Sequence, residues 1–230
     1  MEFARRLSYP AANESYTFAE AIIERCRQRA HRLLDRLGID GSADRLVSIG
    51  PFANHPYKQA PLGLFHKVAR HAIDLGCAVA MIGPSADRNR AEAFCQELGP
   101  RLPAGFFDLV GQLEWDETLG LLALSSLFIS NDSGIMHVSL ACRTGTVAFF
   151  GPTDPYDLVP RNNQDLHPVF LRLPCQPCWQ KGPMRRFRCP EVKKACLEWI
   201  EAGAVTDLIS RLLTTRHPEA RILPSTMKRP

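Results

Sequence analysis

Apolar residues in the first part of the chain recur with the period of a helix. Between residues 17 and 37 they fall at every third or fourth position, and Gly38 follows directly. This stripe predicts an amphipathic helix that ends at the glycine. Thr17 and Glu20 have the spacing of a capping box, which predicts that the first turn lies there. Four arginines fall largely off the stripe and are expected on a solvated face: Arg25, Arg27, Arg29 and Arg32.

After residue 44 the pattern changes to short apolar runs that alternate with helical segments. The predicted strands are 46–49, 78–82, 107–110, 127–130, 147–150 and 169–173. The predicted helices are 62–75, 91–98, 117–124 and 134–142, with two short ones near 191–201 and 206–213. This alternation predicts an α/β fold, in which a Rossmann-like parallel sheet is covered by helices on both faces through right-handed crossovers.

Composition and charge narrow the functional classes. Hydrophobic residues make up 45% of the 230 residues, which is enough for a packed core. A net charge of +4 is a weak hint of anionic partners such as nucleotide phosphates or a membrane surface, and with no motif it gives no support to nucleic-acid binding. The first residues lack the apolar segment of a secretory signal, and the longest apolar stretch, 119–129, is too short to span a bilayer. A cytoplasmic location is therefore expected.

The loop between the strand at 127–130 and the following helix is the most informative segment. It reads Asn131-Asp132-Ser133-Gly134, so small polar residues begin the helix. Backbone N–H groups at such a helix start can hold phosphate oxygens, and Gly134 permits close approach of a ligand. Asp132 could accept hydrogen bonds from sugar hydroxyls. A plain helix N-cap at Asp132 or Ser133 is the structural alternative, and spacing alone leaves both open.

Three other features are ambiguous when each is taken alone. Lys58 lies in a proline-rich loop after the first predicted strand and could contact a diphosphate, or could be a surface lysine. His137 could be a catalytic residue or a structural helix residue. The sequence at 151–155, Gly-Pro-Thr-Asp-Pro, indicates only a turn.

Taken in order, these segments resemble glycosyltransferase family 9. The chain has N-D-S-G-x-M-H at 131–137, a strand ending F-G-P-T-x-P at 150–155, and the cysteine marks C-x-P-C, C-P and C-L at 175–178, 189–190 and 196–197. The resemblance covers about residues 45–213 and is strongest to the lipopolysaccharide heptosyltransferase II group. The ordered set is specific, whereas each piece alone is a weak signal.

The resemblance implies the C-terminal domain of a GT-B fold, in which two Rossmann-like domains face each other across a cleft. It implies metal-independent, inverting transfer of heptose from ADP-L-glycero-D-manno-heptose to the lipopolysaccharide inner core. By the same resemblance, Lys58 meets the donor diphosphate and Asp87 the ribose. The loop around the diphosphate and the heptose is assigned to Asp132, Ser133 and Gly134, and His137 belongs to its motif.

The resemblance also implies that the chain consists of three parts. Residues 1–43 are expected to form an interdomain linker and its helix, 44–214 the donor-binding domain, and 215–230 a loose tail. The segment before the first strand is too short for a second Rossmann-like domain, which in the family carries the acceptor site and the general base. The chain is therefore expected not to transfer sugar alone.

Two departures from the family pattern keep other functions open. Pro51 stands where the family usually has a glycine, which removes a backbone N–H, and Ala60 stands in place of a tryptophan. A non-catalytic nucleotide-sugar-binding module or gene remnant is one alternative. A family 9 transferase with a different donor sugar is another.

Four cysteines cluster near the C-terminal end: Cys175, Cys178, Cys189 and Cys196. No cofactor is expected for the reaction, but four thiols in this order could hold a structural zinc ion. The alternative is a packed loop of reduced thiols. Nearby basic residues could contact anionic lipid or the phosphorylated core at the inner membrane, or simply be solvated: Lys181, Arg185, Arg186, Arg188, Lys193 and Lys194.

Overall fold

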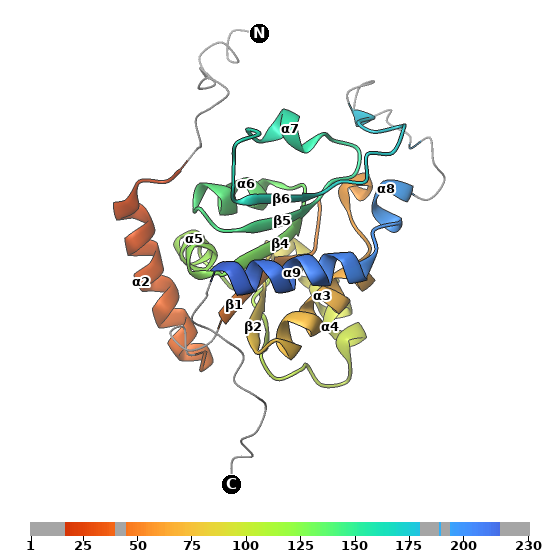
Figure 1. The fold of residues 1–230 in the computed structure, drawn as a ribbon. Coiled ribbons are helices and arrows are strands. Elements are labelled where there is room, and N and C mark those ends of the chain that lie inside the picture. The colour runs from red at the N-terminus through yellow and green to blue at the C-terminus, as the bar shows by residue number, and fades with distance from the viewer. Residues whose placement is uncertain (1–16, 40–44, 180–188, 190–193, 217–230) are drawn as a thin grey trace.

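A six-stranded parallel sheet forms the centre of the computed structural model, which describes residues 17–39, 45–179, 189 and 194–216 (Figure 1). The strand order is β3-β2-β1-β4-β5-β6, and every neighbouring pair runs parallel. The strands are β1 Arg45–Gly50, β2 Cys77–Met81, β3 Phe106–Asp108, β4 Leu127–Asn131, β5 Thr146–Phe149 and β6 Leu166–Val169. The predicted Rossmann-like α/β class is confirmed.

Helices cover both faces of this sheet. The described α-helices are α2 Glu20–Leu37, α3 Leu62–Asp74, α4 Arg88–Leu98, α5 Trp115–Leu124, α6 Gly134–Ala141, α7 Pro155–Leu158, α8 Ala195–Glu198 and α9 Ala202–Arg216. Two short 3-10 helices, η1 Pro56–Lys58 and η2 Ser85–Asp87, follow β1 and β2. None of the helices in the described part of the chain is long and apolar enough to cross a membrane.

Alternate residues of the strands build a separate core on each face. On β1, Val47 and Ile49 pack with apolar residues of α3, α4 and α9. Leu46, on the opposite side of the same strand, packs with apolar residues of α2 and α5. Successive strand side chains point to opposite faces, so each buried strand reads as one continuous apolar run.

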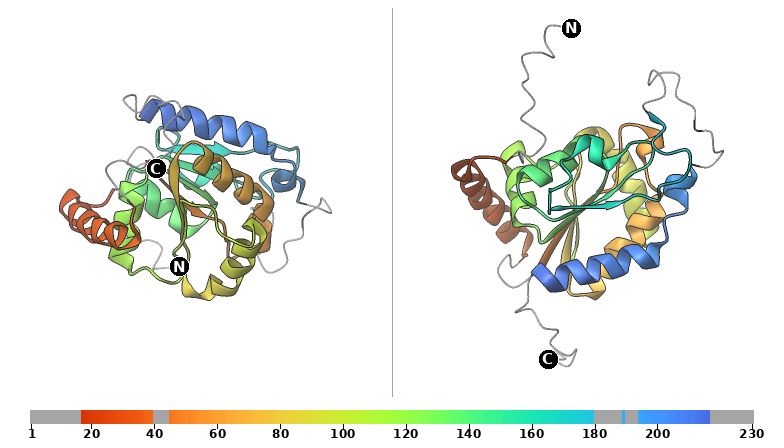
Figure 2. Two further views of the ribbon diagram at one scale, coloured as in Figure 1. Left: turned by 90° about the horizontal axis from the view of Figure 1, so that it is seen from below. Right: turned by 45° about the horizontal axis from the view of Figure 1, so that its top comes forward.

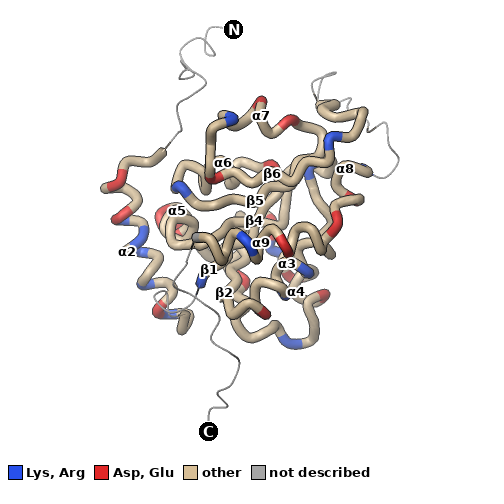
Figure 3. The backbone as a smooth tube through the Cα atoms, in the orientation of Figure 1, with Lys and Arg blue, Asp and Glu red and all other residues tan. Residues whose placement is uncertain are grey.

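Helix α2 belongs to the second of these cores and lies alongside α5 (Figure 2). Its buried residues include Ile23, Cys26 and Leu34, as the apolar stripe predicts. Its charged face is only partly solvated, because Arg29 donates to Asp116 of α5 at 3.1 Å and Arg36 to Glu117 at 3.3 Å. Figure 3 shows that basic and acidic positions both occur along α2. The described part of the predicted linker is therefore packed onto the domain.

Two local predictions were wrong. Helix α2 begins at Glu20 with Ala19 as N-cap and no side-chain cap, so Thr17 forms no capping box. The last strand is Leu166–Val169 and not 169–173, because Arg172 has a positive φ of 54° that is incompatible with extended pairing. Pro168 is tolerated in β6 because this strand lies at the sheet edge.

The predictions for the C-terminal region are tested only in part. The helix predicted near 191–201 is described from residue 194 and contains α8. Helix α9 continues to Arg216, past the predicted start of the tail, and residues 217–230 lie outside the described part.

Candidate functional site

Lys58 and Asp132 form an ion pair at the carboxyl edge of the sheet. Lys58 ends η1 in the loop after β1, and Asp132 directly follows β4, the neighbouring strand. Lys58 Nζ lies 2.5 Å from Asp132 Oδ2, and the Asp132 side chain is only 3% exposed. Thr153, in the loop after β5, donates its hydroxyl to the same oxygen at 2.5 Å. Loops after three adjacent strands therefore meet at one buried carboxylate.

An aromatic group borders Lys58 on its other side. The ammonium lies 5.4 Å from the centre of the Trp179 ring, within range of a cation–π contact. His55 packs edge-on against Trp179 and stacks on Tyr57. The ammonium of Lys58, whose side chain is 21% exposed, therefore lies between the Trp179 ring and the Asp132 carboxylate in its contacts.

Asn131, next to Asp132, fixes the loop that carries Lys58. Its side-chain amide donates to the Pro51 carbonyl and accepts from the Ala60 N–H, both at 2.9 Å. The two partners are the first and last parts of the loop, and Asn131 is fully buried. Sequence reasoning did not single out this residue. The available signal was an asparagine ending an apolar strand, because a buried amide must find partners.

The start of α6, which follows Asp132, leaves room beside the Lys58–Asp132 ion pair. Ser133 is the N-cap, and its buried hydroxyl finds no hydrogen-bond partner among the described residues. A Cβ added at Gly134 would meet nothing within 4 Å. The helix start is therefore open at Gly134, as the anion-binding hypothesis requires.

His137 lies one turn further along α6 and reaches the surface. Partial burial lowers the pKa of its imidazole, the Asp132 carboxylate raises it, and the Lys58 ammonium lowers it again. The net lowering of its pKa favours the neutral imidazole. Its response to both members of the ion pair shows that His137 lies in the same electrostatic environment as they do.

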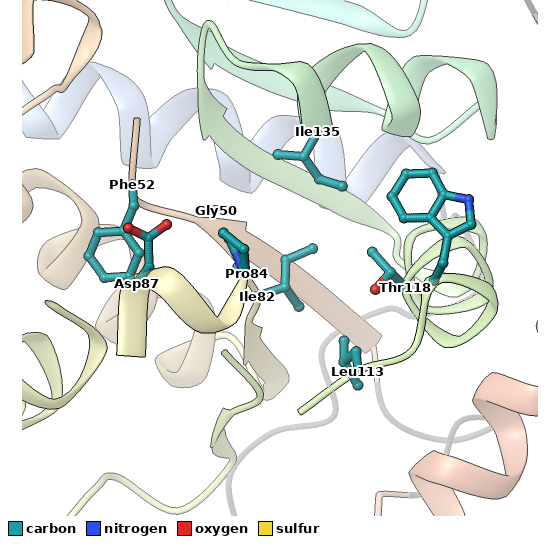
Figure 4. A pocket seen from close by; sticks show the side chains of 10 residues that line it. Gly50, Phe52, Ile82, Pro84, Asp87, Leu113, Thr118 and Ile135 are labelled. Atoms are coloured by element: carbon teal, nitrogen blue, oxygen red, sulfur yellow. The ribbon is translucent and has the colours of Figure 1, made fainter. Parts of the chain in front are cut away.

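A cavity of about 270 Å³ opens next to these loops (Figure 4). Its walls come from the ends of β1 and β2, the loop before α5, and helices α5 and α6. They are mostly apolar: Gly50, Phe52, Ile82, Gly83, Pro84, Asp87, Leu113, Trp115, Thr118 and Ile135. Ile135 belongs to the first turn of α6, so the cavity adjoins the helix start. The cavity's two polar side chains lie at opposite ends in Figure 4, with Asp87 beside Phe52 and Thr118 across the cavity, so the walls between them are apolar.

Asp87 supplies the carboxylate of this cavity. It lies at the same end as Phe52 in Figure 4, and its side chain is 14% exposed. Arg90 Nη1 lies 2.7 Å from Asp87 Oδ1. All six residues that the sequence predicts for donor binding thus lie at the carboxyl edge of the sheet, in two adjoining parts. Their roles toward a ligand stay predictions.

The four clustered cysteines lie beside the same edge. The backbone N–H groups of Cys178 and Trp179 both donate to the Pro152 carbonyl at 2.9 Å, which docks this segment on the loop after β5. Burial, and after it the neighbouring thiols of Cys189, Cys178 and Cys175, raise the pKa of the Cys196 thiol to about 11. Cys196 is thus near enough to the other three thiols to feel their charge.

Proximity alone does not make this cluster a metal site. Within the described residues, which include all four cysteines, no three His, Cys, Asp or Glu side chains are arranged to hold a metal ion. Zinc stays a hypothesis that metal analysis of the purified chain decides. Stoichiometric zinc would support it, and eight reactive thiols without metal would refute it.

Of the basic residues near the cysteines, only Lys194 is described. It does not extend into solvent, because its ammonium donates to the Pro56 and Gln59 carbonyls at 3.2 Å each. Lys194 therefore ties the C-terminal segment to the Lys58 loop. The other five lie outside the described residues.

The family assignment follows from comparison with known proteins. Residues 3–185 match the family described as Glycosyltransferase family 9 (heptosyltransferase). The chain belongs to glycosyltransferase family 9. One relative in this family, lipooligosaccharide heptosyltransferase 2 of Campylobacter jejuni, is 39% identical over 93 residues, which are 40% of this chain and 28% of that protein.

Solved structures confirm the family 9 fold. The ADP-heptose lipopolysaccharide heptosyltransferase II of Escherichia coli matches 93% of the chain with a TM-score of 0.67 and 21% identity. The E. coli heptosyltransferase WaaC with ADP-2-deoxy-2-fluoro heptose matches 91% with a TM-score of 0.53 and 18% identity. The family 9 chain spans 57% and 53% of these two structures.

Proposed function

We propose that this chain binds the donor of a heptosyltransferase that uses ADP-L-glycero-D-manno-heptose and acts on the lipopolysaccharide inner core. The observation that carries the proposal is the pairing of Lys58 with Asp132 beside the open start of α6 and an apolar cavity. This arrangement offers a cation and helix N–H groups for a diphosphate, apolar walls for a base, and carboxylates for hydroxyl groups. The heptosyltransferase WaaC, solved with an ADP-heptose analogue, has a similar fold.

Glycosyl transfer places negative charge on the diphosphate as it leaves the anomeric carbon. An ammonium has three N–H donors, and Lys58 uses one on Asp132, so two can turn to phosphate oxygens. The positive end of α6 adds to this stabilisation. We propose that these two groups support the leaving diphosphate without a metal ion, and that transfer inverts the anomeric centre.

The acceptor hydroxyl needs a carboxylate base that this site does not offer. Asp87 and Asp132 line the described site, and each is already held by a cation, Arg90 and Lys58. We propose that the base comes from a second Rossmann-like domain that faces this edge of the sheet, as in the GT-B fold. The reaction would take place in the cytoplasm, with peripheral contact at the inner membrane where a lipid-linked acceptor lies.

Calorimetric titration tests the donor proposal. ADP-heptose is expected to bind at least about tenfold more tightly than UDP-sugars, because the base cavity and the heptose contacts must both fit. ADP alone should bind with intermediate affinity. Equal affinity for UDP-sugars would indicate a different donor, and no binding of any adenine nucleotide would contradict the proposal.

A heptosyl-transfer assay on the same preparation tests the placement of the base. The chain is expected to bind donor but to show no turnover, because neither Asp132 nor Asp87 is available as a base. Ordinary turnover by this chain would refute that part of the proposal and leave the donor assignment standing.

A further inference from the structure

A polar bridge connects the two parts of the site. Arg90, on the first turn of α4, uses one Nη group on Asp87 Oδ1 at 2.7 Å and the other on Gln59 Oε1 at 2.7 Å. Asp87 lines the apolar cavity, whereas Gln59 directly follows Lys58. One guanidinium therefore joins the carboxylate of the cavity to the loop of the ion pair.

The guanidinium of Arg90 also packs on an aromatic ring. Its central carbon lies 4.6 Å from the centre of the Phe52 ring, so the guanidinium rests on an aromatic face. Phe52 itself is buried and lines the cavity. A guanidinium holds its donors in a rigid planar fork, so it makes both contacts in one fixed geometry, whereas an ammonium is a point charge on a flexible stem.

Gln59, the second partner of Arg90, makes hydrogen bonds with the backbone of the loop that carries Lys58. Its Oε1 also accepts from the Ala53 N–H at 2.9 Å, and its Nε2 donates to the Pro51 and Ala60 carbonyls at 2.6 and 2.9 Å. Asn131 holds the same two residues, through the Pro51 carbonyl and the Ala60 N–H. Every side-chain group of Gln59 is therefore used to shape the loop that presents Lys58.

The contact with Arg90 engages only one oxygen of the Asp87 carboxylate. Arg90 occupies Oδ1, and the structure describes no partner for Oδ2. A carboxylate fixed by one oxygen can offer the other to a hydroxyl pair without losing its partner.

We propose that Arg90 is a positioning residue that couples the nucleoside part of the site to the diphosphate part. Through Asp87 it sets the carboxylate that faces the cavity, and through Gln59 it sets the loop that carries Lys58. Occupation of either part then favours the geometry of the other. This inference rests on the proposed donor function and adds the residue that links its two halves.

Amide hydrogen exchange on the unliganded chain tests the bridge independently of any ligand. In Arg90→Met, the Ala53 and Ala60 amides are expected to exchange at least about tenfold faster than in the unaltered chain, because the guanidinium contacts that hold Gln59 are lost. Arg211→Met on the exposed face of α9 is the matched control and should leave both amides unchanged. Unchanged exchange in Arg90→Met would overturn the proposal.

Titration with ADP and with inorganic diphosphate then tests the coupling. Arg90→Met is expected to weaken both ligands by about tenfold, the loss of a charge-assisted hydrogen bond. Arg90→Lys keeps the charge but not the fork, and Gln59→Leu keeps the guanidinium but breaks the bridge, so both should match Arg90→Met. Full binding in Arg90→Lys or Gln59→Leu would show direct attraction to phosphate and overturn the coupling. If the unaltered chain binds neither ligand, the donor function fails, and the exchange result still decides whether the bridge shapes the loop.

Discussion

Replacing Lys58 by methionine is expected to weaken ADP-heptose binding by about ten- to a hundredfold, the loss of one or two charge-assisted hydrogen bonds to the diphosphate. Methionine keeps most of the apolar part of the side chain but removes the ammonium that pairs with Asp132. Calorimetric titration with ADP-heptose and with adenosine measures the effect. Adenosine lacks phosphate, so its affinity should change little.

The same substitution also removes the only cation paired with a buried carboxylate in the described site. Asp132 would keep the Thr153 hydroxyl, which does not neutralise its charge. Thermal unfolding must therefore accompany the titration. Lys58→Arg retains the charge and should recover most of the affinity. Lys67→Met, on the exposed face of α3, is the matched control. Unchanged ADP-heptose affinity in a folded Lys58→Met protein would contradict the proposed role.

The meeting of Lys58 and Asp132 could be anticipated from the sequence because of a property of parallel sheets. Apolar runs at 46–49 and 127–130 indicated buried strands, and the loops after parallel strands emerge at one edge. The structure pairs these strands directly, as β1 and β4. Hydrophobic periodicity thus predicted where the site lies, although it could not predict an ion pair of 2.5 Å.

The residues that organise the site could not be predicted, because their contacts join positions far apart in the chain. Gln59 and Arg90 are separated by 31 positions, and Asn131 is 80 positions from Pro51. No local pattern encodes such pairs, since each depends on the packing of several elements at once. Thr153 was part of a recognised turn, yet its hydroxyl contact with Asp132 follows only from the position of β5 beside β4.

The limits of local patterns also appear at α2. The spacing of Thr17 and Glu20 satisfies a capping box, but α2 starts later because its position is set by packing on α5. Tertiary contacts overrode a local preference of about 1 kcal/mol. One of these contacts is the close approach of α2 to Gly120 of α5.

Gly120 marks the point where α2 and α5 touch backbone to backbone. A Cβ added there would overlap the Cys26 carbonyl of α2 and lie 2.8 Å from the Ala30 side chain. In an open helix position, glycine to alanine stabilises a protein by about 0.5–1 kcal/mol. At Gly120 the opposite sign is expected, because backbone atoms of α2 cannot move aside locally and the whole helix must shift.

Gly120→Ala is therefore expected to lower the free energy of unfolding by about 2–3 kcal/mol, a cost typical of overpacking at a close helix crossing. Urea unfolding measures it. Gly63→Ala is the matched control, since a Cβ at this helical glycine of α3 meets nothing within 4 Å and should be neutral or stabilising. Equal or greater stability in Gly120→Ala would show that α2 does not pack at this distance, and would restore the interpretation of residues 17–39 as a linker helix. A loss confined to Gly120→Ala would instead show that α2 packs as part of the domain, against the helix that contributes Trp115 and Thr118 to the cavity.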